Sequence, residues 1–408
     1  MAWDFRRYGS ALDPIHKSHL NDLTGDWGCP TRFRFARDEA SENKGSRAFD
    51  LGKPVRGDAA CGTAAHETIA RALSNRATRE RILAGPGAFK LRESILTVFN
   101  EELAREIGPR RVEWYDESRE AMIADRVSMV LGVLNDMHRY VAEVVLVEPA
   151  FVFKLGKYWL QGHIDLVYRP TDARDRLAIT DWKTGAARPD PIELDHGWEA
   201  GVYSTALQSG WFLPRESMTS TQDADGTWSV GCGMLAARHP SRYIAERDCA
   251  ERVLTAAAAA IEAHGDVTSI GPLQRFNEYP SRIYHTHLGD YVPYKRAGKK
   301  QVKRPEDLAF YQRTTAGEVK YVANDLRGPA WLPVRMTEHD RPRVEHRIRN
   351  IVGMVRMGRF IDQVGDRCKR CPFAQECLNT GYAVRGDERA QLERGLHADD
   401  VAAAEDLD

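Results

Sequence analysis

The sequence predicts an α/β fold, and two patterns lead to that prediction. From about 58 to 143, apolar residues such as Ile69 and Leu73 recur at intervals of three and four, which is typical of amphipathic helices. Between 144 and 182 the chain is rich in apolar, β-branched stretches bounded by polar turns, which is typical of strands. The chain therefore combines a largely helical region with a β-rich block.

Length and charge limit the class of protein. The chain has 408 residues, of which 42% are hydrophobic, so one large domain or two ordinary ones can bury a core. The formal net charge of −1 excludes a generally basic nucleic-acid coat, so any binding groove depends on local charge. We find no signal-peptide pattern and no apolar run of the roughly 18 residues that a membrane span needs, so we expect a soluble, cytoplasmic protein.

The local patterns give an ordered set of elements. Strands are expected in the β-rich block, and helix returns near 197–209. Two further strands, an alanine-rich helix and a last amphipathic helix follow. In chain order the expected strands and helices after residue 143 are 144–153, 158–168, 177–182, 197–209, 227–236, 243–246, 250–263 and 339–361.

Composition divides the chain into five parts. A stretch at 281–304 holds seven Lys or Arg residues against one acid, together with three tyrosines. It fits either a solvated loop or a surface that binds a nucleic-acid strand. The parts are an N-terminal segment (1–57), a core (58–280), a basic aromatic insertion (281–335), a C-terminal helix with clustered cysteines (336–385) and an acidic tail (386–408).

Two expected strands carry residues suited to hydrolysis. Asp165 lies on strand 158–168, and Asp181 and Lys183 lie two apart on the next strand, so they project from one face. If the strands pair, two carboxylates and an ammonium group meet. Carboxylate oxygens are ligands for Mg²⁺ or Mn²⁺, which activates a water. A metal beside Lys183 would lower the pKa of its ammonium group and favour a role as a base. The alternative is that this Asp-x-Lys motif is a solvated turn, which is the more common case at the end of a strand.

Two helical segments add candidates to this site. His66 follows Gly62 in a helix, and its imidazole would complete a metal site with Asp165 and Asp181, although a lone helical histidine is more often structural. Glu199 and Tyr203 lie four apart and therefore share a helix face.

Three of the seven cysteines cluster near the C-terminus. Cys368, Cys371 and Cys377 supply three thiolates within ten residues, and a fourth ligand has to come from elsewhere. Cys29 is the best candidate because it stands before a proline in an aromatic, basic stretch, and Cys61 is the second choice. A 4Fe–4S cluster and a Zn²⁺ site both fit this pattern.

These motifs resemble a known family. The order Cys29, Gly62-x-x-x-His66, Gly162-His163-Ile164-Asp165, Asp181-Trp182-Lys183, Tyr203 and Cys368-x-x-Cys371-x-x-x-x-x-Cys377 is similar to the PD-(D/E)XK nucleases of the RecB type over roughly residues 20–380. The subgroup with split iron–sulfur cysteines, which includes the AddB nuclease domain and the CRISPR-adaptation nucleases, is the most similar.

The resemblance implies a restriction-endonuclease-like central mixed sheet flanked by helices, with the N- and C-terminal segments stapled by the cluster. It implies that His66, Asp165, Asp181 and the carbonyl of Trp182 bind the metal and that Lys183 is catalytic. The family has glutamine where this chain has Glu199, which cannot donate an amide hydrogen bond.

The expected function is therefore metal-dependent hydrolysis of DNA, by an exonuclease or a nuclease for free ends or single strands in repair, recombination or defence. No helicase motif is present, so unwinding would need a partner protein. The alternatives are a non-catalytic nucleic-acid-binding subunit and a binding protein stapled by zinc.

Overall fold

The computed structural model describes most of the central part of the chain and little of its ends. The chain divides into two compact units, 1–10 with 15–45 and 346–408, and 11–14 with 46–345, and each is treated separately below. The described residues are 15–17, 29, 31–32, 55–85, 88–114, 118–156, 158–185, 194, 197–215, 219–222, 228–231, 236–239, 254, 263, 273–288, 311–313, 319–321, 329–335 and 340–356.

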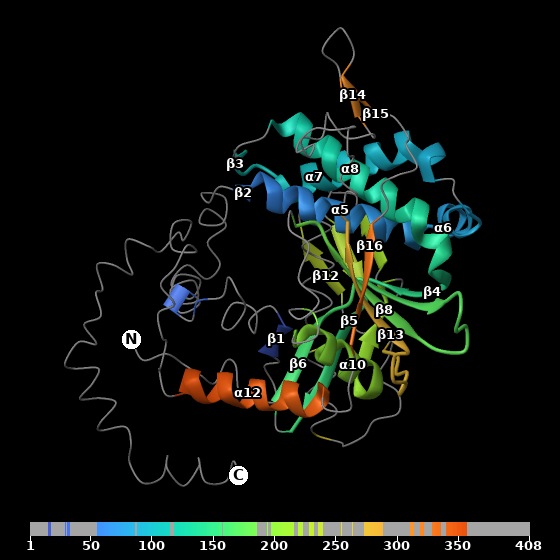
Figure 1. Ribbon diagram of the computed structural model, residues 1–408. Helices are drawn as coiled ribbons and strands as arrows, with labels where there is room; N and C mark the ends of the chain where they lie inside the picture. The colour runs from blue at the N-terminus through green and yellow to red at the C-terminus, as the bar shows by residue number, and fades with distance from the viewer. Residues whose placement is uncertain are drawn as a thin grey trace, which may run out of the picture. The chain divides into compact units, whose positions relative to one another are not determined.

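Three helices form one layer of the second unit, α5 (Gly57–Ser74), α7 (Arg92–Ile107) and α8 (Arg119–Asp136). They lie side by side in Figure 1, and α5 packs against both of the others. Small residues of α5, among them the fully buried Ala64 and Ala65, permit this close approach. Two short helices, α6 (Arg76–Leu83) and η1 (Ala88–Leu91), connect α5 to α7, and η2 (Met137–Arg139) follows α8.

A mixed sheet is the second layer, as the family resemblance implies. Among the described residues its strands run in the order β16, β13, β8, β7, β4, with β8 and β13 parallel and the other neighbours antiparallel. One face packs on the helical layer, since Trp182 of β8 belongs to the same core as α5 and α8. The strands are β4 (Val141–Val147), β7 (Leu166–Pro170), β8 (Ala178–Lys183), β13 (Arg282–His287) and β16 (Ala330–Val334).

A separate set of strands, β6, β5 and β9, packs against α10 (Glu199–Ser209). The chain passes between the two sheets twice. It leaves β4 for β5 at Glu148 and Pro149, and it leaves β6 for β7 at Ile164 and Asp165. These strands are β5 (Ala150–Leu155), β6 (Tyr158–His163) and β9 (Trp211–Leu213).

The crossings correct two predicted strands. The stretches 144–153 and 158–168 are not single strands, because each contributes to two different sheets. The strand-like pattern continues through each break, because flanking apolar residues such as Val147 and Leu166 are buried. Asp165 consequently lies between β6 and β7 rather than within a strand.

The structure narrows the predicted insertion at 281–335. Its two ends, β13 and β16, are paired strands of the central sheet, so only the chain between them can be additional. Within that stretch β14 (Tyr311–Arg313) pairs with β15 (Val319–Tyr321). The predicted strand 243–246 and nearly all of the alanine-rich helix lie outside the described residues, as does the acidic tail.

The remaining elements are short strands and the last helix. An antiparallel meander consists of β10 (Thr219–Gln222), β11 (Trp228–Gly231) and β12 (Ala236–His239). The predicted last helix is α12 (Asp340–Arg356), and the short strands are β1 (Ile15–His16), β2 (Val55–Arg56) and β3 (Val112–Glu113). In the part of the chain that the structure describes, no helix has the length and apolar character of a membrane span.

Trp331 provides a test of the sheet's far edge. This residue of β16 is nearly buried and stacks on Tyr140 with ring centroids 4.4 Å apart. Trp331→Ala should destabilise the protein by about 3–5 kcal/mol, the usual cost of emptying an aromatic core position. Chemical denaturation measures the change, with Tyr279→Ala, at a residue 44% exposed, as the control. Equal effects of the two substitutions would contradict the assignment of β16 to the sheet.

Candidate functional site

Three side chains from separate segments come together beside the crossings. One ligand atom each of His66, Glu148 and Asp165 lies within 4.8 Å of the other two, and we call these residues the ligand group. His66 comes from α5, and its Nδ1 lies 3.5 Å from Oδ2 of Asp165. The group therefore combines one imidazole and two carboxylates at a single point.

The crossings themselves hold Glu148 and Asp165 together. The N–H of Glu148 donates to the carbonyl of Asp165 (2.9 Å), and the N–H of Ile164 donates to the carbonyl of Pro149 (3.2 Å). Glu148 has a φ of 44°, an unusual conformation for a residue other than glycine. Backbone bonds thus fix both carboxylates at the junction of the two sheets.

Gly62 explains how α5 comes close enough to deliver His66. A Cβ at this position would approach Oγ1 of Thr184, directly after β8, to 3.0 Å. Because glycine has no side chain, the helix can lie against the end of β8. Gly62 and His66 lie one helical turn apart, so this contact places the imidazole beside the strand end.

One edge of β8, near its C-terminal end, faces the ligand group. The N–H of Trp182 donates to Oδ2 of Asp165 (2.5 Å). Because the N–H and C=O of one residue point to the same edge of a strand, the carbonyl of Trp182 is also directed toward Asp165. This is the orientation that a carbonyl metal ligand needs.

Lys183, Asp181, Glu199 and Tyr203 form a second set of contacts, which we call the lysine group. Nζ of Lys183 lies 2.5 Å from Oδ2 of Asp181 and 3.5 Å from Oε2 of Glu199. The hydroxyl of Tyr203 donates to Oδ1 of Asp181 (2.8 Å). The shared helix face of Glu199 and Tyr203 therefore meets the Asp181-Trp182-Lys183 motif, and Glu199 contacts the lysine as an ion-pair partner.

Asp181 lies in the lysine group and is not part of the ligand group. Each of its oxygens has a protein partner, one in Tyr203 and one in Lys183. The two groups are still close enough to interact, because the charge of Asp181 affects the pKa of both His66 and Glu148.

Burial and like charge make the ligand group electrostatically strained. Burial, and then the charges of Asp165 and Glu67, raise the pKa of Glu148 well above its usual range. Burial opposes charge on Asp165 too, but His66 and Lys183 together bring its pKa below the usual value. For His66, the attraction of Asp165 outweighs burial and raises the pKa. A divalent cation would offset this negative charge, and the oxygen-rich donor set fits Mg²⁺ or Mn²⁺.

Carboxylates surround Lys183 in the metal-free protein. Burial acts to lower its pKa, but Asp181 and Glu199 outweigh burial and raise the pKa above the usual lysine value. The ammonium form is therefore favoured in the absence of a metal. The expected lowering of this pKa concerns the protein with a metal bound beside Lys183, so the base role stays a prediction.

Glu148 is the member of the site that sequence reasoning missed. It is the only acid in the apolar stretch 144–153, and it precedes a proline. Burying a single acid among apolar residues is energetically costly, so its presence in such a stretch is a signal of a functional role. The apolar pattern predicts one continuous strand over 144–153, and this prediction hides the crossing where Glu148 lies.

The cysteines are only partly described. Cys368, Cys371 and Cys377 lie outside the described residues, and Cys29 is half-buried. Cys61 is fully buried in the core around α5. Burial raises the pKa of the Cys61 thiol to about 11, which keeps the thiol protonated near neutral pH and fits simple packing.

Comparison with protein-family models matches residues 27–378 to the PD-(D/E)XK nuclease superfamily. The chain belongs to this superfamily. No curated protein matches the chain in a sequence comparison. Membership agrees with the mixed sheet flanked by helices and with the acid–lysine motif at the end of β8.

Glu148→Gln should stabilise the metal-free protein. Because folding raises the pKa of Glu148, the folded chain binds this proton more tightly than the unfolded chain does. Stability is therefore lost as pH rises through the window from an ordinary glutamate pKa to the raised one. The glutamine variant does not lose this stability as pH rises. With a chelator present, it should therefore have a higher melting temperature than the wild type at pH values above this window.

Thermal melts between about pH 4 and pH 9 measure this difference, which should vanish at the acid end where Glu148 is protonated in both states. Glu143→Gln, which removes an exposed acid of β4, serves as the control and should leave the pH dependence unchanged. A glutamine variant that is less stable than wild type at high pH would contradict the buried-charge interpretation.

Proposed function

We propose that this protein is a metal-dependent nuclease that hydrolyses DNA phosphodiester bonds. The observation that supports it most strongly is the ligand group, whose donor atoms lie within 4.8 Å of one another beside the lysine group. In a PD-(D/E)XK superfamily member, this combination of hard oxygen donors and an adjacent ammonium fits phosphate hydrolysis.

Each group has a distinct task in this proposal. His66, Glu148 and Asp165 would hold the cation, with the carbonyl of Trp182 and the carboxylate of Asp181 as further ligands. Bound Mg²⁺ or Mn²⁺ supplies Lewis acidity to the phosphate and lowers the pKa of a water. Lys183 offsets negative charge on the reacting phosphate and orients the attacking water. Glu199 and Tyr203 hold Lys183 and Asp181 in place.

We base the proposed substrate and pathway on the resemblance to RecB-type nucleases. We propose an exonuclease, or a nuclease acting on free ends or single strands, in repair, recombination or defence, working with a helicase or another DNA-processing protein. A panel of linear, circular, single- and double-stranded DNA and RNA with Mg²⁺ or Mn²⁺ tests this directly. Binding without cleavage throughout the panel would favour the alternative of a non-catalytic binding subunit.

Lys183→Ala should reduce cleavage by about a hundredfold or more, equivalent to roughly 3 kcal/mol of barrier. Asp165→Ala and Asp181→Ala should have effects of similar size. Initial rates on a labelled oligonucleotide measure the loss, and circular dichroism verifies folding. Lys154→Ala, at an exposed lysine of β5, is the matched control and should cleave normally. Wild-type rates in folded Lys183→Ala protein would refute the catalytic assignment.

We further propose a 4Fe–4S cluster held by Cys29, Cys368, Cys371 and Cys377. The division of the chain supports this, because the compact unit that contains 15–45 also contains 346–408. Hydrolysis requires no electron transfer, so we assign the cluster a structural role. Zinc is the alternative metal, and colour distinguishes the two, since an iron–sulfur protein is brown.

Cys29→Ala should lose iron and colour and should melt earlier than the wild type, because a crosslink between distant segments restricts the unfolded chain. Cys61→Ala is the matched control and should keep the colour, since Cys61 packs in the core. Metal analysis and absorbance near 400 nm measure both variants. Loss of colour in Cys61→Ala alone would assign the fourth ligand to Cys61. A colourless wild-type protein that contains zinc would show that the bound metal is zinc and not iron.

A further inference from the structure

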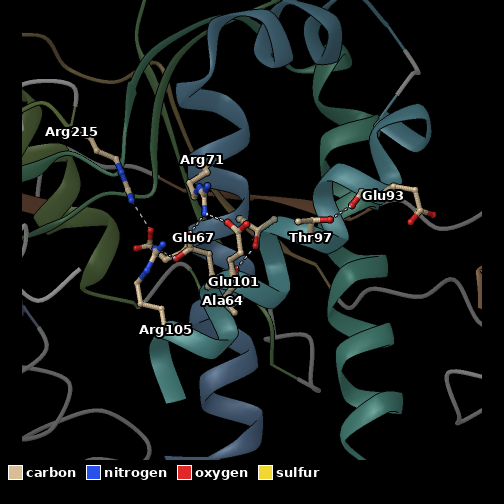
Figure 2. A network of polar contacts seen from close by, with 10 residues as sticks. Ala64, Glu67, Arg71, Glu93, Thr97, Glu101, Arg105 and Arg215 are labelled. Atoms are coloured by element: carbon tan, nitrogen blue, oxygen red, sulfur yellow. Dashed lines mark hydrogen bonds and ion pairs between the residues drawn. The ribbon is translucent and has the colours of Figure 1, made fainter. Parts of the chain in front are cut away.

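A second ion pair lies beside the ligand group. Nη2 of Arg215 lies 2.6 Å from Oε2 of Glu67, and both side chains are largely buried, with 22% and 15% of their surface exposed. Figure 2 shows Arg215 directed toward Glu67 on α5, while Arg71, one turn farther along that helix, turns toward Glu101 of α7. The two arginines thus connect α5 to different neighbours.

The two partners adjoin two members of the ligand group. Glu67 directly follows His66 in α5. Arg215 lies two residues beyond the end of β9, and Glu148 lies two residues before the start of β5. Since Ala150 pairs with Leu213 in these antiparallel strands, Glu148 and Arg215 leave the sheet at the same end. The ion pair therefore joins the helix that carries His66 to the sheet end that carries Glu148.

The pair also lies within the electrostatic reach of the ligand group. Glu67 and Arg215 both act on the charge of Glu148, with opposite signs. A largely buried charge pair of this kind fixes the relative position of the segments that carry it. Separating the partners would leave each charge uncompensated in a low-dielectric environment. Glu148 is in turn bonded through its N–H to Asp165, so the restraint reaches all three ligand residues.

We propose that Glu67 and Arg215 are positioning residues, which hold His66 and Glu148 at metal-binding distance. The inference rests on the proposed function, because it assigns these residues to the metal site of that nuclease. Without the pair, α5 and the segment that follows β9 lose their direct ionic connection, and part of the free energy of metal binding goes into bringing the ligands together. Loss of such supporting contacts typically weakens metal binding about tenfold to a hundredfold.

Mn²⁺ titration of the full-length protein, followed by electron paramagnetic resonance of the free ion, tests the proposal without nucleic acid. Arg215→Gln and Glu67→Gln should each weaken Mn²⁺ binding by about tenfold or more. Arg215→Lys keeps the charge and should recover most of the affinity. The double variant should be little worse than either single variant, because both remove one shared interaction.

The direction in which Mn²⁺ affinity changes distinguishes a positioning role of Arg215 from simple neutralisation of Glu67. If Arg215 only neutralised Glu67, Arg215→Gln would leave an additional acid beside the site and would tighten Mn²⁺ binding. Tighter or unchanged binding therefore overturns the proposal, even if the melting temperature falls. Glu101→Gln is the matched control, because it removes an ion pair of α5 that faces α7, and it should leave Mn²⁺ affinity unchanged.

The wild type distinguishes this inference from the proposed function. A wild-type protein that binds no Mn²⁺ overturns the metal site itself and, with it, the positioning role. A wild type that binds Mn²⁺ while the Arg215 and Glu67 variants bind equally well overturns only the positioning role. Calorimetric melts of each variant establish that the compared proteins are folded.

Discussion

The two hydrogen bonds that join the Glu148–Pro149 and Ile164–Asp165 crossings determine the arrangement of the site. They occur where the chain leaves one sheet for the other, and they bring two carboxylates to one partly buried point. Burying like charges together opposes folding, as the raised pKa of Glu148 indicates. The fold tolerates this arrangement because backbone pairing on both sides of the crossings fixes the chain there.

The helical layer is adapted to that junction. Small residues let α5 lie close to α7, α8 and the end of β8, so that His66 reaches Asp165. On the other face of the sheet, α10 supplies the contacts that hold Lys183 and Asp181. The ligand group and the lysine group are thus supported by different elements, and β8 is the strand that connects them.

The glutamate at position 199 is an instructive departure from the family pattern. An amide at this place can donate a hydrogen bond, whereas Glu199 offers a carboxylate 3.5 Å from the ammonium of Lys183. Together with Asp181, it surrounds the lysine with negative charge and favours the protonated form. In this chain the helix face therefore restrains Lys183 through ionic attraction.

The sequence by itself determined the α/β class and the identity of β8, because periodicity is a local property of the chain. It also predicted the candidate site residues His66, Asp165, Asp181, Lys183, Glu199 and Tyr203, through motif spacing and the family resemblance. Tertiary structure alone decided that two apparent strands divide between sheets, that β13 and β16 belong to the central sheet, and that Glu148 joins the ligand group. These features depend on pairing between distant segments, and buried apolar residues such as Val147 and Leu166 flank the crossings. Local hydrophobic patterns cannot distinguish a strand that continues in one sheet from one that changes sheets.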